Sequence, residues 1–259
     1  VVAFYRYIFI ALVLLPPFFR YLDQWRALLW GLTSGAAMGL GAIGYVTALE
    51  TVPVSTVGVM YMTYPVFTML IAWLFFTDTP SLRSIIASLL IIAAAVIAGA
   101  PEAVTSDQLP ALLISLFAPI GFGLGICVLV HKLSDVPPVA RMGSVSLGAV
   151  LGLLPLVLLT PSAELLPPAP KDWWLILGIA LVTGLLPMLL YTIASPIAGT
   201  ARSAVIGSVE LPTFFLVGLI AFGEPITLPQ AIACIIILGA ITLSTKRKTA
   251  AVAQTLTHS

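Results

Sequence analysis

One carboxylate lies deep in a long apolar stretch of this sequence. Glu210 is near the middle of the run Ala201–Phe222. A charge at the centre of a bilayer costs roughly 2.5–3.5 kcal/mol on insertion scales, so Glu210 is expected to face the protein interior and to have a partner. The functional interpretation is a proton-coupling or substrate-binding group. The structural alternative is an acid that caps backbone groups freed by Pro212.

Two tyrosines could form the wall of a binding site. Tyr61 and Tyr64 are three residues apart, so a helix places them on one face. Pro65 removes a backbone hydrogen bond beside them, and broken helices line cavities in membrane proteins. Tyrosine rings combine an apolar body with a hydroxyl, which suits an amphiphilic ligand. An interfacial aromatic belt is the structural alternative.

Basic side chains mark the ends of the apolar runs. Arg6, Arg141 and Arg202 lie near predicted helix starts, and we interpret them as snorkelling to lipid phosphates. For Arg202 we also predict binding of a substrate carboxylate at the cytoplasmic mouth. His131 ends an apolar run and is interpreted as an interface residue. The predicted substrate-binding set is Tyr61, Tyr64, Thr63, Tyr45, Tyr191, Glu210 and Arg202, with Glu210 also predicted to couple protons.

The composition defines the elements that must position these residues. Only 8% of the 259 residues are charged, against about 25% in soluble domains. A net charge of +1 excludes a basic field for nucleic acid. Two cysteines make neither a disulfide framework nor a zinc site, and we predict no metal and no cofactor. The sequence is therefore that of an integral membrane protein in contact with lipid.

Nine apolar runs are long enough to cross a membrane. They are continuous rather than alternating, which favours helices over a barrel, and predicts an all-α membrane protein. Alternation of the helices places all Lys and Arg residues except Arg6 and Lys171 on one side. That side, with the C-terminus, is therefore predicted to be cytoplasmic in the cell inner membrane. The runs are Ala3–Phe19, Ala27–Leu49, Thr56–Phe76, Ser84–Ala100, Leu109–Val130, Val139–Leu159, Trp173–Ala194, Ala201–Phe222 and Leu228–Thr245.

The two halves of the sequence match. The segment Tyr45–Ala48 resembles Tyr191–Ala194, 146 residues later, and Tyr64-Pro65 matches Leu211-Pro212 at a shift of 147. We predict a first repeat over residues 1–107, a second over 108–245, and a cytoplasmic tail over 246–259. The second half has five runs and the first has four, so we expect a tenth, first helix upstream of Val1. Five helices per repeat invert the second copy and place a site at the interface.

These motifs also resemble a known family. Ser208-Val-Glu-Leu-Pro212, followed by Phe222-Gly-Glu-Pro225, is similar to EamA-type exporters of the drug/metabolite transporter superfamily. The resemblance implies two inverted five-helix repeats, cytoplasmic termini and export of small metabolites such as amino acids. In the first repeat Asp78 stands where that family usually has Glu.

We therefore predict a secondary transporter that exports small organic metabolites, namely amino acids or related compounds and possibly drugs, by alternating access. A homodimer is possible. A passive facilitator or channel is the first alternative, although neither a filter nor a charged ring is found. An intramembrane enzyme is the second, but no catalytic motif is found, so we predict no enzymatic activity.

Overall fold

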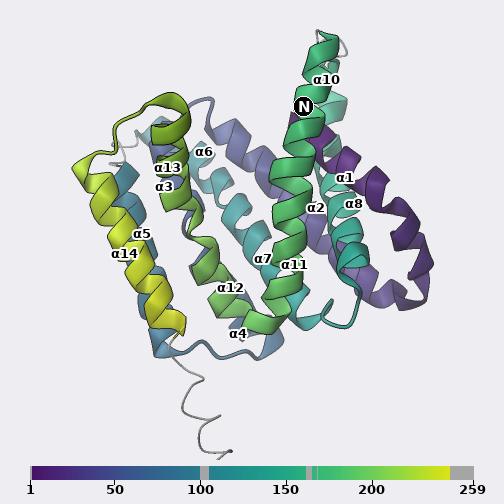
Figure 1. The fold of residues 1–259 in the computed structure, drawn as a ribbon, viewed down its shortest axis with the longest axis horizontal. Helices are drawn as coiled ribbons and strands as arrows, with labels where there is room; N and C mark the ends of the chain where they lie inside the picture. Colours follow the sequence, from purple (N-terminus) through teal and green to yellow (C-terminus); the bar gives the residue numbers. More distant parts are fainter. Residues whose placement is uncertain (1, 100–104, 162–164, 168, 246–259) are drawn as a thin grey trace, which may run out of the picture.

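The computed structural model describes residues 2–99, 105–161, 165–167 and 169–245, and within them it contains helices and no strand. The nine predicted runs are mainly helical there, with turns at Leu49, Met62–Thr63, Leu116 and Ser208–Val209. Ala100 lies outside the described residues, together with the predicted tail. Eight helical stretches are long and apolar enough to span a membrane, and a ninth, Leu228–Ser244, is slightly shorter. The described residues thus form a multi-pass helical membrane protein (Figure 1).

Several spans are made of consecutive helical pieces. The elements are α1 (Val2–Arg20), η1 (Leu22–Gln24), α2 (Trp25–Ala48), α3 (Val54–Tyr61), α4 (Tyr64–Phe76), α5 (Leu82–Gly99), η2 (Ser106–Gln108), α6 (Leu109–Ser115), α7 (Phe117–His131), α8 (Pro138–Leu159), α10 (Pro170–Ile179), η3 (Ala180–Leu185), α11 (Leu186–Ala198), α12 (Thr200–Gly207), α13 (Glu210–Phe222) and α14 (Leu228–Thr245).

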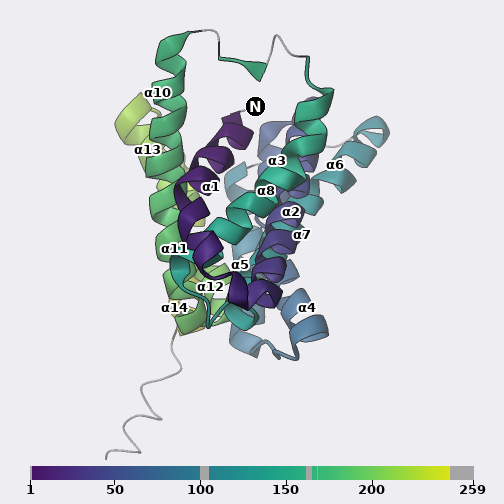
Figure 2. The ribbon, with the colours of Figure 1, turned by 90° about the vertical axis from the view of Figure 1, so that its right-hand side faces the viewer.

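The ends of corresponding helices recur at a constant interval. α3 and α12 begin 146 residues apart, and so do α5 and α14. The caps that end α4 and α13, Thr77 and Gly223, are also 146 apart, and both are left-handed, with φ of 56° and 69°. The matched pieces run in opposite directions, since α3 and α13 lie at one end of the molecule and α4 and α12 at the other (Figures 1 and 2).

The two ends of the bundle differ in charge. One end, at the bottom of Figure 1, carries Arg20, Arg26, Arg83, Lys132 and Arg202, and we call it the arginine-rich end. The connections at the other end carry Glu50, Asp107, Asp172 and Glu224 with one cation, Lys171, and we call it the acidic end.

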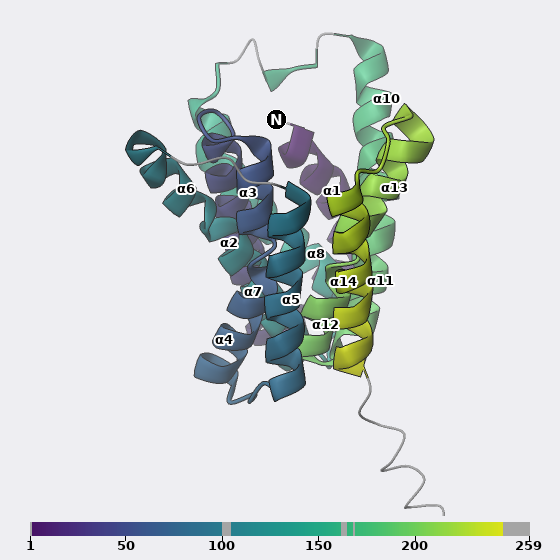
Figure 3. The ribbon, with the colours of Figure 1, turned by 90° about the vertical axis from the view of Figure 1, so that its left-hand side faces the viewer.

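Two groups of helices pack tightly through small residues. α2 meets α8 backbone to backbone, because a Cβ on Gly35 would lie 2.0 Å from the Val145 carbonyl oxygen and one on Gly148 would lie 2.1 Å from that of Leu32. A Cβ on Gly121 of α7 would lie 2.5 Å from the Ala37 oxygen. On the other side, α5 and α14 pack through a second buried cluster that includes Ala87, Ile91, Ala233, Ile237 and Ala240. Figure 3 shows the α5–α14 pair beside α12 and α13.

Candidate functional site

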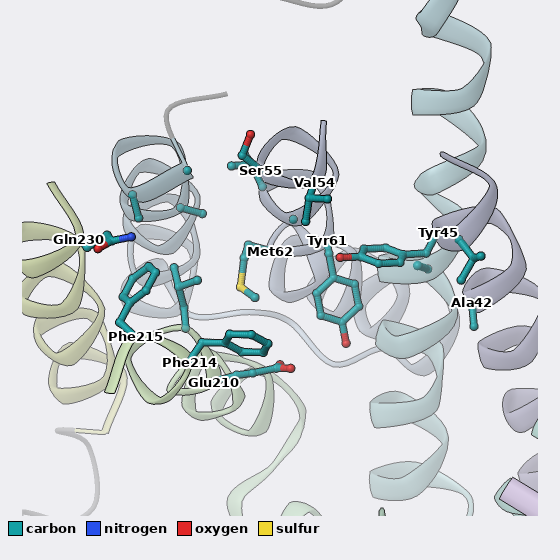
Figure 4. Close-up of a pocket in the computed structure, with 18 of the residues that line it drawn as sticks. Ala42, Tyr45, Val54, Ser55, Tyr61, Met62, Glu210, Phe214, Phe215 and Gln230 are labelled. Atoms are coloured by element: carbon teal, nitrogen blue, oxygen red, sulfur yellow. The ribbon is translucent and has the colours of Figure 1, made fainter. Parts of the chain in front are cut away.

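An open cavity of about 710 Å³ lies between the α2–α7–α8 group and the α5–α14 pair. Its walls include the last turn of α2, the start of α3, the end of α5 and the start of α14, all of which are at the acidic end. Most lining side chains are apolar, among them Met62, Phe214 and Phe215, while Ser55, Gln230, Tyr45, Tyr61 and Glu210 are polar (Figure 4). A mainly apolar pocket of this size with a few placed polar groups is typical of a site for an organic molecule.

Among the described residues, Glu210 supplies the only carboxylate in that lining. It is the first residue of α13, directly after the break at Ser208 and Val209, where the helix dipole favours a negative charge. Its side chain is exposed to the cavity and has no hydrogen-bond or ion-pair partner among the described residues, although the sequence predicted one. In Figure 4 the carboxylate points toward the side of the cavity that holds Tyr61 and Tyr45.

An aromatic cluster, which we call the aromatic floor, adjoins this cavity at Tyr61. It consists of Tyr61, Tyr64, Phe122 and Tyr191, whose neighbouring ring centroids are 5.0–6.3 Å apart. Tyr64 is fully buried, and its hydroxyl donates to the Ala204 carbonyl oxygen at 3.0 Å. The Tyr191 hydroxyl donates to the carbonyl oxygen of Ser203 at 3.1 Å. The floor is therefore hydrogen-bonded to α12.

The predicted substrate-binding residues separate into three places. Tyr45, Tyr61 and Glu210 line the cavity. Tyr64 and Tyr191 do not line it, contrary to the prediction, because both reach across to α12 and lie behind the cavity surface. Thr63 is also outside the lining, since its hydroxyl donates to the Met60 carbonyl oxygen of its own chain segment at 2.6 Å.

Arg202 belongs to a second, smaller pocket at the arginine-rich end. This pocket, of about 230 Å³, is also lined by Asp78, Arg83, Ser84 and Thr200. Arg202 thus lines a different pocket from Tyr45, Tyr61 and Glu210, with which the prediction grouped it. Its predicted role at a mouth of the protein remains a prediction.

Arg141 differs from the snorkelling side chain that the sequence predicted. It is buried, with 7% of its surface exposed, and its guanidinium donates to the carbonyl oxygens of Val136, Ser134 and Thr192. These bonds connect the α7–α8 loop to α11. The residue therefore fixes the backbone at this end and does not extend toward lipid.

A polar contact at the arginine-rich end has no counterpart in the sequence prediction. Thr200 Oγ1 lies 2.9 Å from Asp78 Oδ2 and 3.0 Å from His131 Nε2. The imidazole also stacks on Phe76, with ring centroids 5.0 Å apart. His131 is therefore a hydrogen-bonded component of this end. In the sequence, the one feature that pointed to this polar contact was Asp78, which stands where the EamA-type exporters usually have Glu.

The fold defines a multi-pass helical membrane protein with an open cavity, and comparison with known proteins identifies its family. The sequence profile of the EamA-like transporter family matches residues 1–100 and 109–246. The chain therefore belongs to the EamA-like transporter family, within the drug/metabolite transporter superfamily, whose members are generally transporters and not enzymes.

A solved structure shares the fold. A crystal structure described only as that of a protein superposes with a TM-score of 0.74 over 94% of this chain and 86% of its own, at 17% sequence identity. No curated protein matches the sequence.

Proposed function

We propose that this protein is a secondary carrier that exports small organic metabolites, such as amino acids, related compounds or drugs, across the inner membrane. The observation that carries the proposal is the mainly apolar cavity beside Glu210, whose walls include elements at the acidic end and which adjoins the aromatic floor at Tyr61. A site that is accessible from one side at a time is the requirement of alternating access.

The orientation follows from charge. Cytoplasmic loops of membrane proteins carry an excess of Lys and Arg, so the arginine-rich end and the C-terminus are assigned to the cytoplasm. The acidic end then faces outward, and the cavity is in its outward-open state.

The opposite directions of matched pieces, at a constant interval of 146 residues, support two inverted repeats, at 1–107 and 108–245. The complete unit would have ten helices. A homodimer is compatible with this arrangement.

Glu210 is proposed as the group that exchanges a proton for substrate. Among the described residues it is the one acid in a mainly apolar wall, it has no partner, and it begins α13 directly after a break in the helix. Tyr45 and Tyr61 would hold the organic part of the substrate, while Tyr64, Tyr191 and Thr63 would act only when α12 moves. Arg202 would meet substrate first, at the cytoplasmic pocket.

Proteoliposome flux tests this function, with amino acids, nucleosides and cationic drugs as candidate solutes. A carrier shows saturable counterflow, whereas a passive channel shows a conductance that rises linearly with concentration. Glu210→Gln should abolish proton-driven accumulation and retain exchange. Glu224→Gln, which changes an acid in the α13–α14 connection, is the matched control and should retain both. Accumulation at the wild-type rate in Glu210→Gln would reduce Glu210 to a structural acid.

A further inference from the structure

Three residues from separate segments meet at the arginine-rich end. His131 ends α7, Asp78 follows α4, and Thr200 begins α12. Besides the two bonds of Thr200, His131 Nε2 lies 3.4 Å from Asp78 Oδ2. The side chains of His131 and Asp78 are 26% and 41% exposed, so water can deliver a proton to them.

The donors and acceptors of this cluster fix where its protons are. A hydroxyl has one proton to donate, and an ionised carboxylate only accepts. Thr200 therefore donates to Asp78 and accepts from His131, which requires a proton on Nε2. Both the neutral Nε2–H form and the imidazolium meet that requirement. The imidazolium adds an ionic attraction to Asp78 and a cation–π contact with Phe76.

The cluster holds one end of a short, separable helix. α12 lies between Gly199, which has φ of +84° and open space where a Cβ would be, and the break at Ser208 and Val209. The tyrosines of the floor bond to its middle, at Ser203 and Ala204. Release of Thr200 would therefore free the start of α12. The rest of the helix would still be held by the floor, by the bond from Ser203 Oγ to the Ser195 carbonyl oxygen, and by Val205, which packs among the buried residues of α5 and α14.

We propose that Asp78, Thr200 and His131 form a proton-sensitive latch that holds α12 closed over the cytoplasmic side of the cavity. This inference rests on the proposed function, because the proposed function assigns the arginine-rich end to the cytoplasm and requires α12 to move. A proton on His131 strengthens the closed state. A rise in cytoplasmic pH removes the charge of His131 and favours opening.

The surrounding charges set the strength of this response. Lys132, the neighbour of His131 in the sequence, is a cation and lies over the rings of Trp30 and Phe76, at 5.5 and 5.8 Å from their centroids. Among the helices packed against α7, α4 leads into the carboxylate of Asp78.

The other packed helices contribute less. Arg26 of α2 lies over Trp25, and Arg202 of α12 lines the second pocket. The Tyr191 hydroxyl of α11 and the Tyr61 hydroxyl of α3 are neutral, and α6 carries no titratable side chain. An exposed ion pair of this kind changes an equilibrium by roughly two- to five-fold.

Cysteine labelling from the cytoplasmic side tests the latch. The reporter is Ser203→Cys, in a chain whose Cys127 and Cys234 are replaced by Ala, because Ser203 is buried in α12 while α12 is closed. Leu22→Cys, exposed at the same end, serves as the reference. The ratio of the two rates with a membrane-impermeant maleimide cancels the effect of pH on thiol reactivity.

This ratio should rise two- to five-fold between about pH 5.5 and pH 8. It should be independent of pH in His131→Gln, which keeps an N–H donor but cannot gain a charge. Thr200→Val should raise the ratio at every pH. Thr242→Val is the matched control and should behave like the parent, since its hydroxyl bonds only to the Gly239 carbonyl oxygen of its own helix.

An unchanged pH response in His131→Gln, or no increase in Thr200→Val, overturns the latch. The result also separates the two proposals. If counterflow occurs and labelling does not depend on pH, the latch is rejected and the carrier is retained. If labelling depends on pH and on His131 but no counterflow occurs, the carrier is rejected and the latch is retained.

Discussion

Gly35→Ala should destabilise the protein by forcing α2 away from α8. The new Cβ would lie 2.0 Å from the Val145 carbonyl oxygen and 2.9 Å from the Ala149 nitrogen. Both neighbours are backbone atoms, so no side chain can rotate to make room. Since ordinary contact begins at 3.4 Å, the helices must separate by about 1.4 Å at this point.

The cost follows from this separation. Overpacking costs typically about 1–3 kcal/mol, and a forced shift of two backbones belongs at the upper end. The better helix propensity of alanine returns up to about 1 kcal/mol. A net loss of about 2 kcal/mol lowers the unfolding temperature of a chain of this size by roughly 4–8 °C.

Thermal unfolding of the detergent-purified protein measures this loss. Gly239→Ala is the matched control, because this glycine of α14 has nothing within 4 Å of its Cβ position. It should leave the unfolding temperature unchanged or raise it by up to about 4 °C. The reasoning would be refuted if the unfolding temperatures of the two variants differed by less than about 1 °C.

Two further substitutions address the floor and the caps. Tyr64→Phe removes the hydroxyl that bonds to Ala204, and the loss of about 1 kcal/mol should raise the labelling rate of Ser203→Cys about five-fold. Unchanged labelling would show that the floor does not hold α12. Thr77→Gly relieves a positive φ of 56° in a β-branched residue and should raise the unfolding temperature by roughly 2–4 °C, whereas a lower temperature would mean that the Thr77 side chain stabilises this turn.

The helices could be predicted because they depend on local patterns. Continuous apolar runs between charged turns identify membrane spans without any knowledge of packing. The breaks were predicted less accurately, since the sequence placed the first kink at Pro65. The structure breaks the helix at Met62 and Thr63, and Pro65 lies in the first turn of α4, where its missing N–H needs no partner.

The site was only partly predictable, because its residues are defined by contacts between distant segments. The helix period places Tyr61 and Tyr64 on similar faces but does not say which of them a neighbouring helix covers. α12 covers Tyr64 and leaves Tyr61 at the cavity. The cluster of Asp78, His131 and Thr200 joins residues 53 and 69 positions apart, so no local spacing could indicate it.

The proposed repeat makes the two gates chemically different. At the repeat interval of 146 residues, Asp78 corresponds to Glu224 and Thr200 corresponds to Val54. Valine has no hydroxyl, so the acidic end cannot form the same hydrogen-bonded latch when the cavity closes there. Protons would then act on the cytoplasmic gate alone, and the outer gate would close through apolar contacts such as those that Val54 can make. The matched gates at the two ends would in this way respond to pH at only one end.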